Sequence, residues 1–304
     1  MSQTIAVRRL GTLALDIVEA NPIVFHGEPW LFEYIRNRDS GADWNTGKSS
    51  YFRFRSLTDI HRFSAPFGHG LHMGNAFAAP DGRVIVTAVE GWGKGRFFQL
   101  ESTDLEHWSE PRVILEDHAW EGYNTTVCQA DNGRCVLAFE LGAPAELVGI
   151  PYTMFFAESR DLRSWRLIPG ARFGQDRYTG APMLRWHDGF FYFFHLEGSY
   201  EKGFATIVAR SRDLTNWEWG DRPVLERSRD DREILPAAAQ DFTPEQLLKV
   251  ATAVNINTSD LDMCDCGGKL RMCYSWGNQR GIEFLALAEA DCTERDFCKS
   301  FFIA

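Results

Sequence analysis

The seven residues SRDLTNW, at positions 211–217, set the pattern that organises this chain. The pattern returns as SRDLRSW at 159–165 and as STDLEHW at 102–108, and a weaker copy, SLTDIHRF, occupies 56–63. The aspartates of the four copies, Asp59, Asp104, Asp161 and Asp213, are spaced by 45, 57 and 52 residues. A repeat of that length indicates one supersecondary unit used several times.

The repeated segment itself is expected to be a structural turn. Ser, Asp and Asn side chains hydrogen-bond to nearby backbone groups in turns. The tryptophan at the end of each copy, such as Trp217, is predicted to anchor its turn against a neighbouring unit. The segment therefore marks where the units lie and does not itself indicate chemistry.

Between the turns lie β-rich runs joined by two-residue turn signals. The signals are Asp81-Gly82, Asn132-Gly133, Asp188-Gly189 and Gly267-Gly268, with His26-Gly27 in the first run. Such a dipeptide between β-rich runs is the strongest short-range signal for a hairpin. The sequence predicts five hairpins, near residues 22–34, 75–90, 124–140, 180–197 and 258–276.

Each hairpin, followed by a third strand, the repeated turn and a fourth strand, makes a four-stranded antiparallel unit. Such units repeated radially form a β-propeller. The expected fold is all-β, a five-bladed β-propeller in a single domain over residues 1–304. Residues 228–254 interrupt the pattern, and there Thr243, Pro244 and Gln246 form a helix-capping signal. A short helical insertion is therefore predicted between blades 4 and 5.

Charge and hydropathy exclude several classes of partner. The net charge is −10, and no basic cluster is present to neutralise phosphates, so no nucleic-acid partner is expected. No run of about 18 apolar residues predicts a membrane span, and the first residues lack a signal-peptide core, so a cytoplasmic location is expected. Seven cysteines, an odd number, fit a reducing compartment. Cys264 and Cys266, in a C-x-C pattern, are interpreted as hairpin thiols, and neither a metal nor a cofactor is expected.

The predicted hairpins converge on one end of the central channel. Hairpin strands are antiparallel, so the residues that open the first strand of a blade lie beside those that close its second strand. The residues that open first strands are Asn21, Asn75, Asn124, Thr179-Gly180 and Ser259-Asp260. The residues that close second strands are Glu33, Glu90, Glu140, His195 with Glu197, and Trp276 with Asn278. These side chains are predicted to line a shared funnel.

A glutamate closes the second strand in four of the five blades. Carboxylates crowded in a funnel repel one another, which raises some of their pKa values and leaves others low. Glycoside hydrolysis needs such a pair, one protonated acid and one ionised base or nucleophile. Each glutamate also has a structural alternative, a hydrogen bond to the backbone of the next blade.

Asp260 is the only carboxylate that opens a first strand, and it is the predicted base or nucleophile. Glu140 or Glu197 is the predicted general acid, and Glu33 and Glu90 are expected to bind hydroxyls or tune pKa values. The other predicted sugar-binding residues are Asn21, Asn75, Asn124, His195, Trp276, Asn278 and Arg280. The expected partner is a small carbohydrate, and the arginines near the funnel are consistent with an anionic sugar.

The repeated turns, the Asn21-Pro22 start and the five hairpins resemble the five-bladed propeller glycosidases of glycoside hydrolase families 43, 32, 62, 68 and 130. The resemblance covers roughly residues 20–225 and 255–302 and implies the propeller fold and carbohydrate hydrolysis. In the family 43 pattern, an Asp opens blade 1, a second Asp opens blade 3 and an acid Glu lies in blade 4. The matching positions here hold Asn21, Asn124 and Thr179. The family's catalytic carboxylates are therefore not carried over.

Two further functions remain open from the sequence. The first is a sugar-binding propeller without catalysis, which the three substituted positions suggest. The second is a metal-dependent lyase or isomerase that uses His69, His72 or His195 together with the glutamates. The leading prediction is a glycoside hydrolase that acts on a small oligosaccharide.

Overall fold

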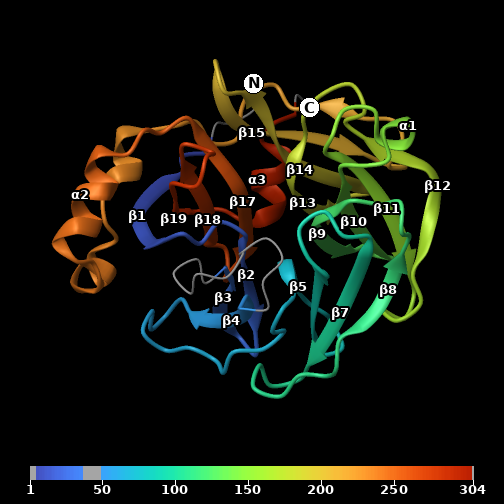
Figure 1. Cartoon of the computed structure of the whole chain (residues 1–304), viewed down its shortest axis with the longest axis horizontal. Coiled ribbons are helices and arrows are strands. Elements are labelled where there is room, and N and C mark those ends of the chain that lie inside the picture. The colour runs from blue at the N-terminus through green and yellow to red at the C-terminus, as the bar shows by residue number, and fades with distance from the viewer. Residues whose placement is uncertain (1–4, 37–48, 303–304) are drawn as a thin grey trace.

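Five β-sheets surround a common axis in the computed structural model, which describes residues 5–36 and 49–302 (Figure 1). Blade 1 contains β2 (Ala20–Phe25), β3 (Glu28–Ile35) and β4 (Tyr51–Ser56). Blade 2 contains β5 (His72–Ala78), β6 (Val84–Val89), β7 (Arg96–Ser102) and β8 (Arg112–Glu116). Blade 3 contains β9 (Gly122–Gln129), β10 (Cys135–Leu141), β11 (Thr153–Ser159) and β12 (Arg166–Phe173). The prediction of a five-bladed all-β propeller is confirmed.

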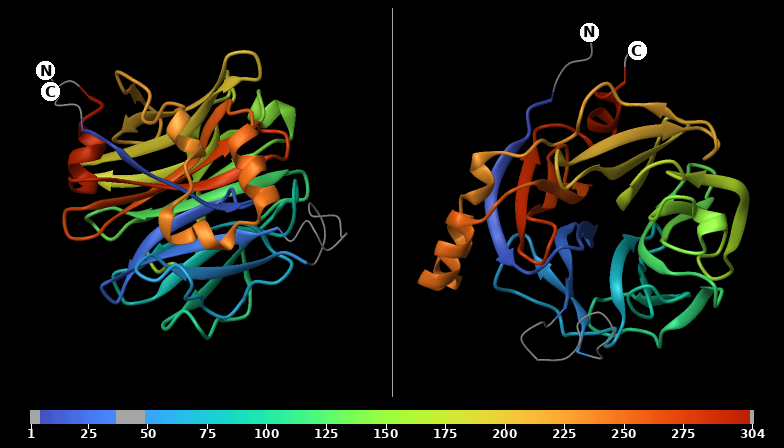
Figure 2. Two further views of the ribbon diagram at one scale, coloured as in Figure 1. Left: turned by 90° about the vertical axis from the view of Figure 1, so that its left-hand side faces the viewer. Right: turned by 45° about the horizontal axis from the view of Figure 1, so that its top comes forward.

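Blade 4 is built in the same way, and blade 5 joins the two ends of the chain. Blade 4 contains β13 (Gly180–His187), β14 (Phe190–Ser199), β15 (Gly203–Ser211) and β16 (Glu218–Trp219). Blade 5 contains β17 (Asn257–Asp265), β18 (Leu270–Gly277), β19 (Glu283–Ala290) and, outermost, β1 (Arg8–Leu15). The strand β1 pairs antiparallel with β19, with Arg8 opposite Glu289 (Figure 2). The start of the chain therefore completes the last blade and closes the ring.

Blade 1 differs from the predicted four-stranded unit because its sheet has three strands. After β4 the chain meets this blade only at isolated bridges, from Phe52 to Phe67 and from Arg55 to Phe63. Pro66 lies between these two bridges and has no N–H to donate to a strand pairing.

The predicted helical insertion lies between β16 and β17. Two short 3-10 turns, Arg229–Arg232 and Pro236–Asp241, precede α2 (Pro244–Thr252). The Thr243 side chain accepts the Gln246 N–H while the Gln246 side chain accepts the Thr243 N–H, which is the predicted capping box. The insertion lies outside the ring beside β1 (Figure 1).

Two other helices are short, α1 (Ala145–Val148) and α3 (Glu294–Lys299). Among residues 5–36 and 49–302, no helix has both the length and the apolar character needed to cross a membrane.

The repeated segments form closed turns, as predicted. In the third full copy, the Ser211 hydroxyl accepts the backbone N–H groups of Asp213 and Leu214. The Asp213 carboxylate accepts the N–H groups of the next two residues after Leu214. Leu214 is fully buried and has a φ of 66°, and Leu105 and Leu162 repeat this conformation with φ of 66° and 56°.

The tryptophan of each repeated turn packs on the preceding blade, which confirms the predicted anchor. The Trp108 ring stacks on Phe67 beside blade 1, with ring centroids 3.8 Å apart. Trp165 of blade 3 donates from Nε1 to Oε1 of Gln99 in blade 2, over 3.0 Å. Trp217 of blade 4 packs edge-on against Phe173 of blade 3. The repeat therefore fixes neighbouring blades to one another.

Candidate functional site

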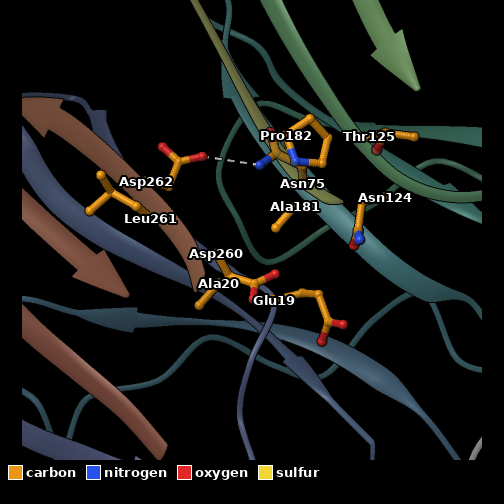
Figure 3. A pocket seen from close by; sticks show the side chains of 11 residues that line it. Glu19, Ala20, Asn75, Asn124, Thr125, Ala181, Pro182, Asp260, Leu261 and Asp262 are labelled. Carbon is orange, nitrogen blue, oxygen red and sulfur yellow. Dashed lines mark hydrogen bonds between the residues drawn. The ribbon is translucent and has the colours of Figure 1, made fainter. Parts of the chain in front are cut away.

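A cavity of about 540 Å³ opens at one mouth of the central channel. Side chains from all five blades line it, because antiparallel hairpins bring the starts of first strands and the ends of second strands to the same face. One residue from each blade in turn is Glu19, Met73, Glu140, Ala181 and Asp260. Below the cavity, the channel narrows to a space of about 30 Å³ between the innermost strands (Figure 3).

A β-bulge repeated in three blades aims side chains into this cavity. The pairing of the first strand with the second slips at equivalent points of β5, β13 and β17. The first bulged residues, Met73, Ala181 and Asp260, have φ of 47°, 54° and 51°. Positive φ is uncommon outside glycine, and bulges re-aim side chains beside functional sites. Asp260 is the one ionisable side chain of the three.

Asp260 lies deep in the cavity, and its pKa is raised. Burial raises the pKa of Asp260 to about 7, and the negative charge of Glu19 adds to the increase. The Glu19 side chain lies beside Asp260 at the start of β2 (Figure 3). Part of Asp260 remains open to the cavity. The carboxyl group can therefore exchange a proton with a bound molecule near neutral pH.

Glu140 lies at the end of β10, where its pairing with β9 is irregular. Its side chain is 3% exposed. Burial raises the pKa of Glu140 to about 8, and the charge of Asp260 contributes to the increase. Asn124 donates from Nδ2 to Oε2 of Glu140 over 3.0 Å, and this hydrogen bond lowers the pKa of Glu140 and partly offsets the increase. Glu140 is therefore mostly protonated at neutral pH.

Aromatic side chains form a continuous wall on one side of the cavity. The ring centroids are 5.5 Å apart for Trp92 and Tyr123, 4.9 Å for Tyr123 and Tyr152, and 5.6 Å for Tyr152 and Tyr178. All three pairs meet edge to face, the geometry that aromatic rings prefer. Such a wall offers apolar surface next to the two carboxyl groups.

Among the predicted binding residues, the structure brings Asn124 and Arg280 into the cavity with Glu140 and Asp260. The Arg280 guanidinium lies 4.5 Å from the centre of the Tyr200 ring. Asn75 lines the narrow space below and donates to Oδ2 of Asp262 over 3.3 Å (Figure 3).

Two of the predicted glutamates are held elsewhere by arginines. Glu33 is fully buried in blade 1, where it accepts from Arg53 Nε over 2.7 Å and from Arg55 Nε over 2.5 Å. Glu90 pairs with Arg96 at the edge of blade 2. Neither side chain lines the cavity. Their carboxyl groups instead pair with arginines of their own blades.

The predicted pair His195 and Glu197 also lies outside the cavity lining. His195 is fully buried beside Phe173, and burial lowers its pKa. His195 Nε2 lies 3.1 Å from Oε1 of Glu197, and the same carboxylate lies 3.9 Å from Arg177. The structure thus places Glu140, rather than Glu197, in the cavity with Asp260.

Three further predicted residues have structural roles. The Trp276 ring is fully buried, stacks on Phe284 and donates to Oγ1 of Thr12 over 2.9 Å. The Asn278 side chain accepts N–H groups of its own loop. The Asn21 amide bonds to the N–H and C=O of Ala76, each over 2.8 Å, and so connects blades 1 and 2. None of these three residues is among those that line the cavity.

Sequence reasoning missed several cavity residues, among them Glu19 and Glu283. Glu19 lies two residues before Asn21, so its place just ahead of the first strand was an available signal. Glu283 opens β19, which is a third strand. The sequence-based prediction considered only first and second strands and therefore did not include it. In the structure it pairs with Arg36, Oε2 to Nη2, over 3.2 Å on the cavity wall. Tyr152 and Tyr200 come from loops that carry no strand signal.

The histidines proposed for a metal site do not gather in the cavity. His72 is buried with its Nδ1 2.6 Å from the Tyr34 hydroxyl, and His69 is exposed beside Tyr51. In the part of the chain that the structure describes, no group of three His, Cys, Asp or Glu side chains has the arrangement of a metal site.

Comparison with known proteins found similar structures but no similar sequences. No protein-family model matches the sequence, and no curated protein matches it. The catalytic domain of a family GH62 α-L-arabinofuranosidase from Coprinopsis cinerea is similar with a TM-score of 0.64 at 13% identity, over 95% of this chain and 98% of that chain. An α-L-arabinofuranosidase from Podospora anserina, solved with cellotriose, has a TM-score of 0.61 at 10% identity, over 94% and 95% of the two chains.

A GH43 protein from Bacillus licheniformis is also similar, with a TM-score of 0.59 at 14% identity, over 93% of this chain and 54% of that chain. The chain is therefore structurally similar to the five-bladed propeller glycoside hydrolases of families 43 and 62. At identities of 10–14%, this structural similarity establishes the fold alone.

Proposed function

We propose that this protein is a glycoside hydrolase that acts on a small oligosaccharide bound in the cavity. The observation that carries the proposal is the pair Glu140 and Asp260, two carboxyl groups from different blades that line one cavity and have unequal, raised pKa values. Glycoside hydrolysis uses two carboxyl groups, one that donates a proton and one that acts as base or nucleophile. The glycosidase-like fold and the aromatic wall support the same class.

In this mechanism Glu140 is the general acid. Its pKa of about 8 keeps it protonated at neutral pH, so it can donate to the glycosidic oxygen. Asn124 donates to Oε2 of Glu140 and so orients the carboxyl group. Asp260, with the lower pKa of about 7, is the base that activates water or the nucleophile that attacks the sugar.

The cavity suits a short sugar chain, with Arg280 as the residue that would bind an anionic substituent. Its guanidinium lies at the cavity over Tyr200, and the structure shows no ion pair for it among the described residues. Arginine binds carboxylates through two parallel N–H groups. The tyrosine faces would pack against sugar C–H groups.

The proposal is tested by incubating the purified protein with a panel of oligosaccharides and aryl glycosides and following products by mass. We expect one or more substrates to be cleaved. Glu140→Gln should remove most of the activity on oligosaccharides, whereas Glu197→Gln, a matched change outside the cavity, should retain it. Equal loss in both variants, or loss in Glu197→Gln alone, contradicts the assignment of the acid.

A sugar-binding propeller without catalysis is the second candidate. It is supported by Asn21, Asn124 and Thr179, which occupy the positions where the family 43 pattern has carboxylates. In the same panel, the binding protein would give no products while a sugar still raised the melting temperature. That result would replace the hydrolase proposal.

A further inference from the structure

A pair of thiols lies at the β17–β18 hairpin, away from the proposed catalytic carboxyl groups. Cys264 is near the end of β17, and Cys266 follows it in the turn. Their Sγ atoms are 3.7 Å apart. An S–S bond is about 2.05 Å long, so the two sulfur atoms must move closer together to form one.

The two thiols have different surroundings, which gives them different roles. Cys264 is buried, whereas Cys266 is half-buried and reachable from solvent. A hydrogen bond from Cys264 lowers the pKa of Cys266, and the positive charge of Arg271 acts in the same direction. The thiolate is the nucleophile in thiol–disulfide exchange. Cys266 is therefore the attacking thiol and Cys264 the resolving thiol.

Hydrogen bonds of the Asp265 side chain fix the turn that carries this pair of thiols. The Asp265 carboxylate, between the two cysteines, accepts the N–H of Gly268 over 2.8 Å and the N–H of Glu294 over 3.2 Å. These bonds tie the hairpin turn to the start of α3. At the tip, a Cβ built on Gly267 or Gly268 would meet nothing within 4 Å, and Cys266 beside them is half-buried.

We propose that Cys264 and Cys266 form a redox-active dithiol that exchanges with a low-molecular-weight disulfide such as oxidised glutathione. The Cys266 thiolate attacks one sulfur of the glutathione disulfide, forms a mixed disulfide and releases one glutathione thiolate. The Cys264 sulfur then attacks Cys266 Sγ and gives its proton to the departing glutathione, which leaves as a thiol. The net change oxidises two cysteine thiols to one disulfide and reduces one glutathione disulfide to two thiols.

Peptide mapping after oxidation tests the proposal. The folded protein is incubated with oxidised glutathione at neutral pH, acid-quenched, alkylated and digested. We expect the peptide containing residues 264–266 to lose both alkylation sites and to be two hydrogens lighter, and dithiothreitol to restore both sites. In Cys264→Ser the reaction should stop with one glutathione on Cys266, and in Cys266→Ser this peptide should take up no glutathione.

Cys292 is the internal control, because it is half-buried like Cys266 but burial and the nearby Asp296 raise its pKa to about 11. We expect Cys292 to remain alkylatable under the same conditions. The proposal is overturned if Cys266 stays fully alkylated in the folded wild-type protein, or if Cys292 reacts as fast as Cys266. The test does not depend on glycosidase activity, so either proposal can fail without the other.

Discussion

Glu140 and Glu33 show how two similar glutamates acquire different properties from their neighbours. Both close a second strand after an apolar run, and both are buried. Glu33 accepts hydrogen bonds from two arginines of its own blade. Glu140 has a neutral amide partner, Asn124, and the carboxyl group of Asp260 nearby. The environment of Glu140 raises its pKa and favours the protonated acid.

The first prediction concerns the role of Glu140 as the acid. Glu140→Gln removes the donated proton, so hydrolysis of an alkyl glycoside should fall by about 10²–10⁴-fold. An aryl glycoside whose phenol leaves without protonation should lose much less activity. The measurement is kcat/KM on the two substrates for wild type and variant. Equal losses on both substrates would contradict the assignment.

The second prediction concerns pH. Asp260 must be ionised, so kcat/KM should fall as the pH decreases through about 7. Glu140 must be protonated, so kcat/KM should fall as the pH rises above about 8. The charges of Glu140 and Asp260 interact, so the pKa values read from the two limbs of the pH profile are apparent values that belong to the pair. A bell-shaped profile with its maximum between these limbs is expected, and a profile flat from pH 5 to 10 would contradict it.

At the scale of residues, the sequence predicted Glu140, Asp260 and Asn124 in the cavity because strand ends converge in antiparallel hairpins. It also placed Trp276 in the predicted sugar-binding set, whereas the structure buries that ring against Phe284 and Thr12 of its own blade, outside the cavity lining. The raised pKa values depend on burial by residues from several blades, which no local pattern records.

At the scale of elements, the repeated turns decide how neighbouring blades connect. Each turn combines a Ser and an Asp that bond the backbone with a buried Leu at positive φ and a Trp on the preceding blade. The sequence predicted these turns, the hairpins and the cap of α2, since each has local turn chemistry. The three bulges in β5, β13 and β17 share no residue pattern, so only the structure revealed that they aim Asp260 into the cavity.

The third prediction tests the turn. Asp213→Ala removes the acceptor of the Thr215 and Asn216 N–H groups. The melting temperature should fall by a few degrees, and glycosidase activity at low temperature should be unchanged because the turn lies away from the cavity. Thermal unfolding followed by circular dichroism measures the first effect. An unchanged melting temperature would show that the turn does not need this carboxylate.

At the scale of the whole molecule, β1 closes the ring by pairing with β19, and the insertion between β16 and β17 hydrogen-bonds to β1. Thr12 of β1 donates its N–H to Glu233 O over 2.7 Å and accepts the N–H of Leu235 over 2.9 Å. The sequence did not predict β1 as the outer strand of blade 5, because its partner β19 lies more than 250 residues away and pairing at that distance leaves no local signal.

The fourth prediction tests this closure. Gly11 has a φ of +115°, and a Cβ there would lie 2.6 Å from Leu235 N. Gly11→Ala should therefore destabilise the protein by about 1–3 kcal/mol through overpacking, measured by urea unfolding. Gly27→Ala is the matched control, since Gly27 also has positive φ but nothing within 4 Å of its Cβ. Equal effects of the two changes would assign the loss to backbone strain instead.

The most direct test of the central claim is the rate of glycoside cleavage by Asp260→Asn relative to wild type, on a substrate that the wild-type protein cleaves. The substitution keeps the shape of the side chain and removes its ability to act as base or nucleophile. We predict that the rate falls by about 10²–10⁴-fold while the melting temperature is unchanged or higher, because a buried carboxyl group is removed. A variant that cleaves as fast as wild type would contradict the account.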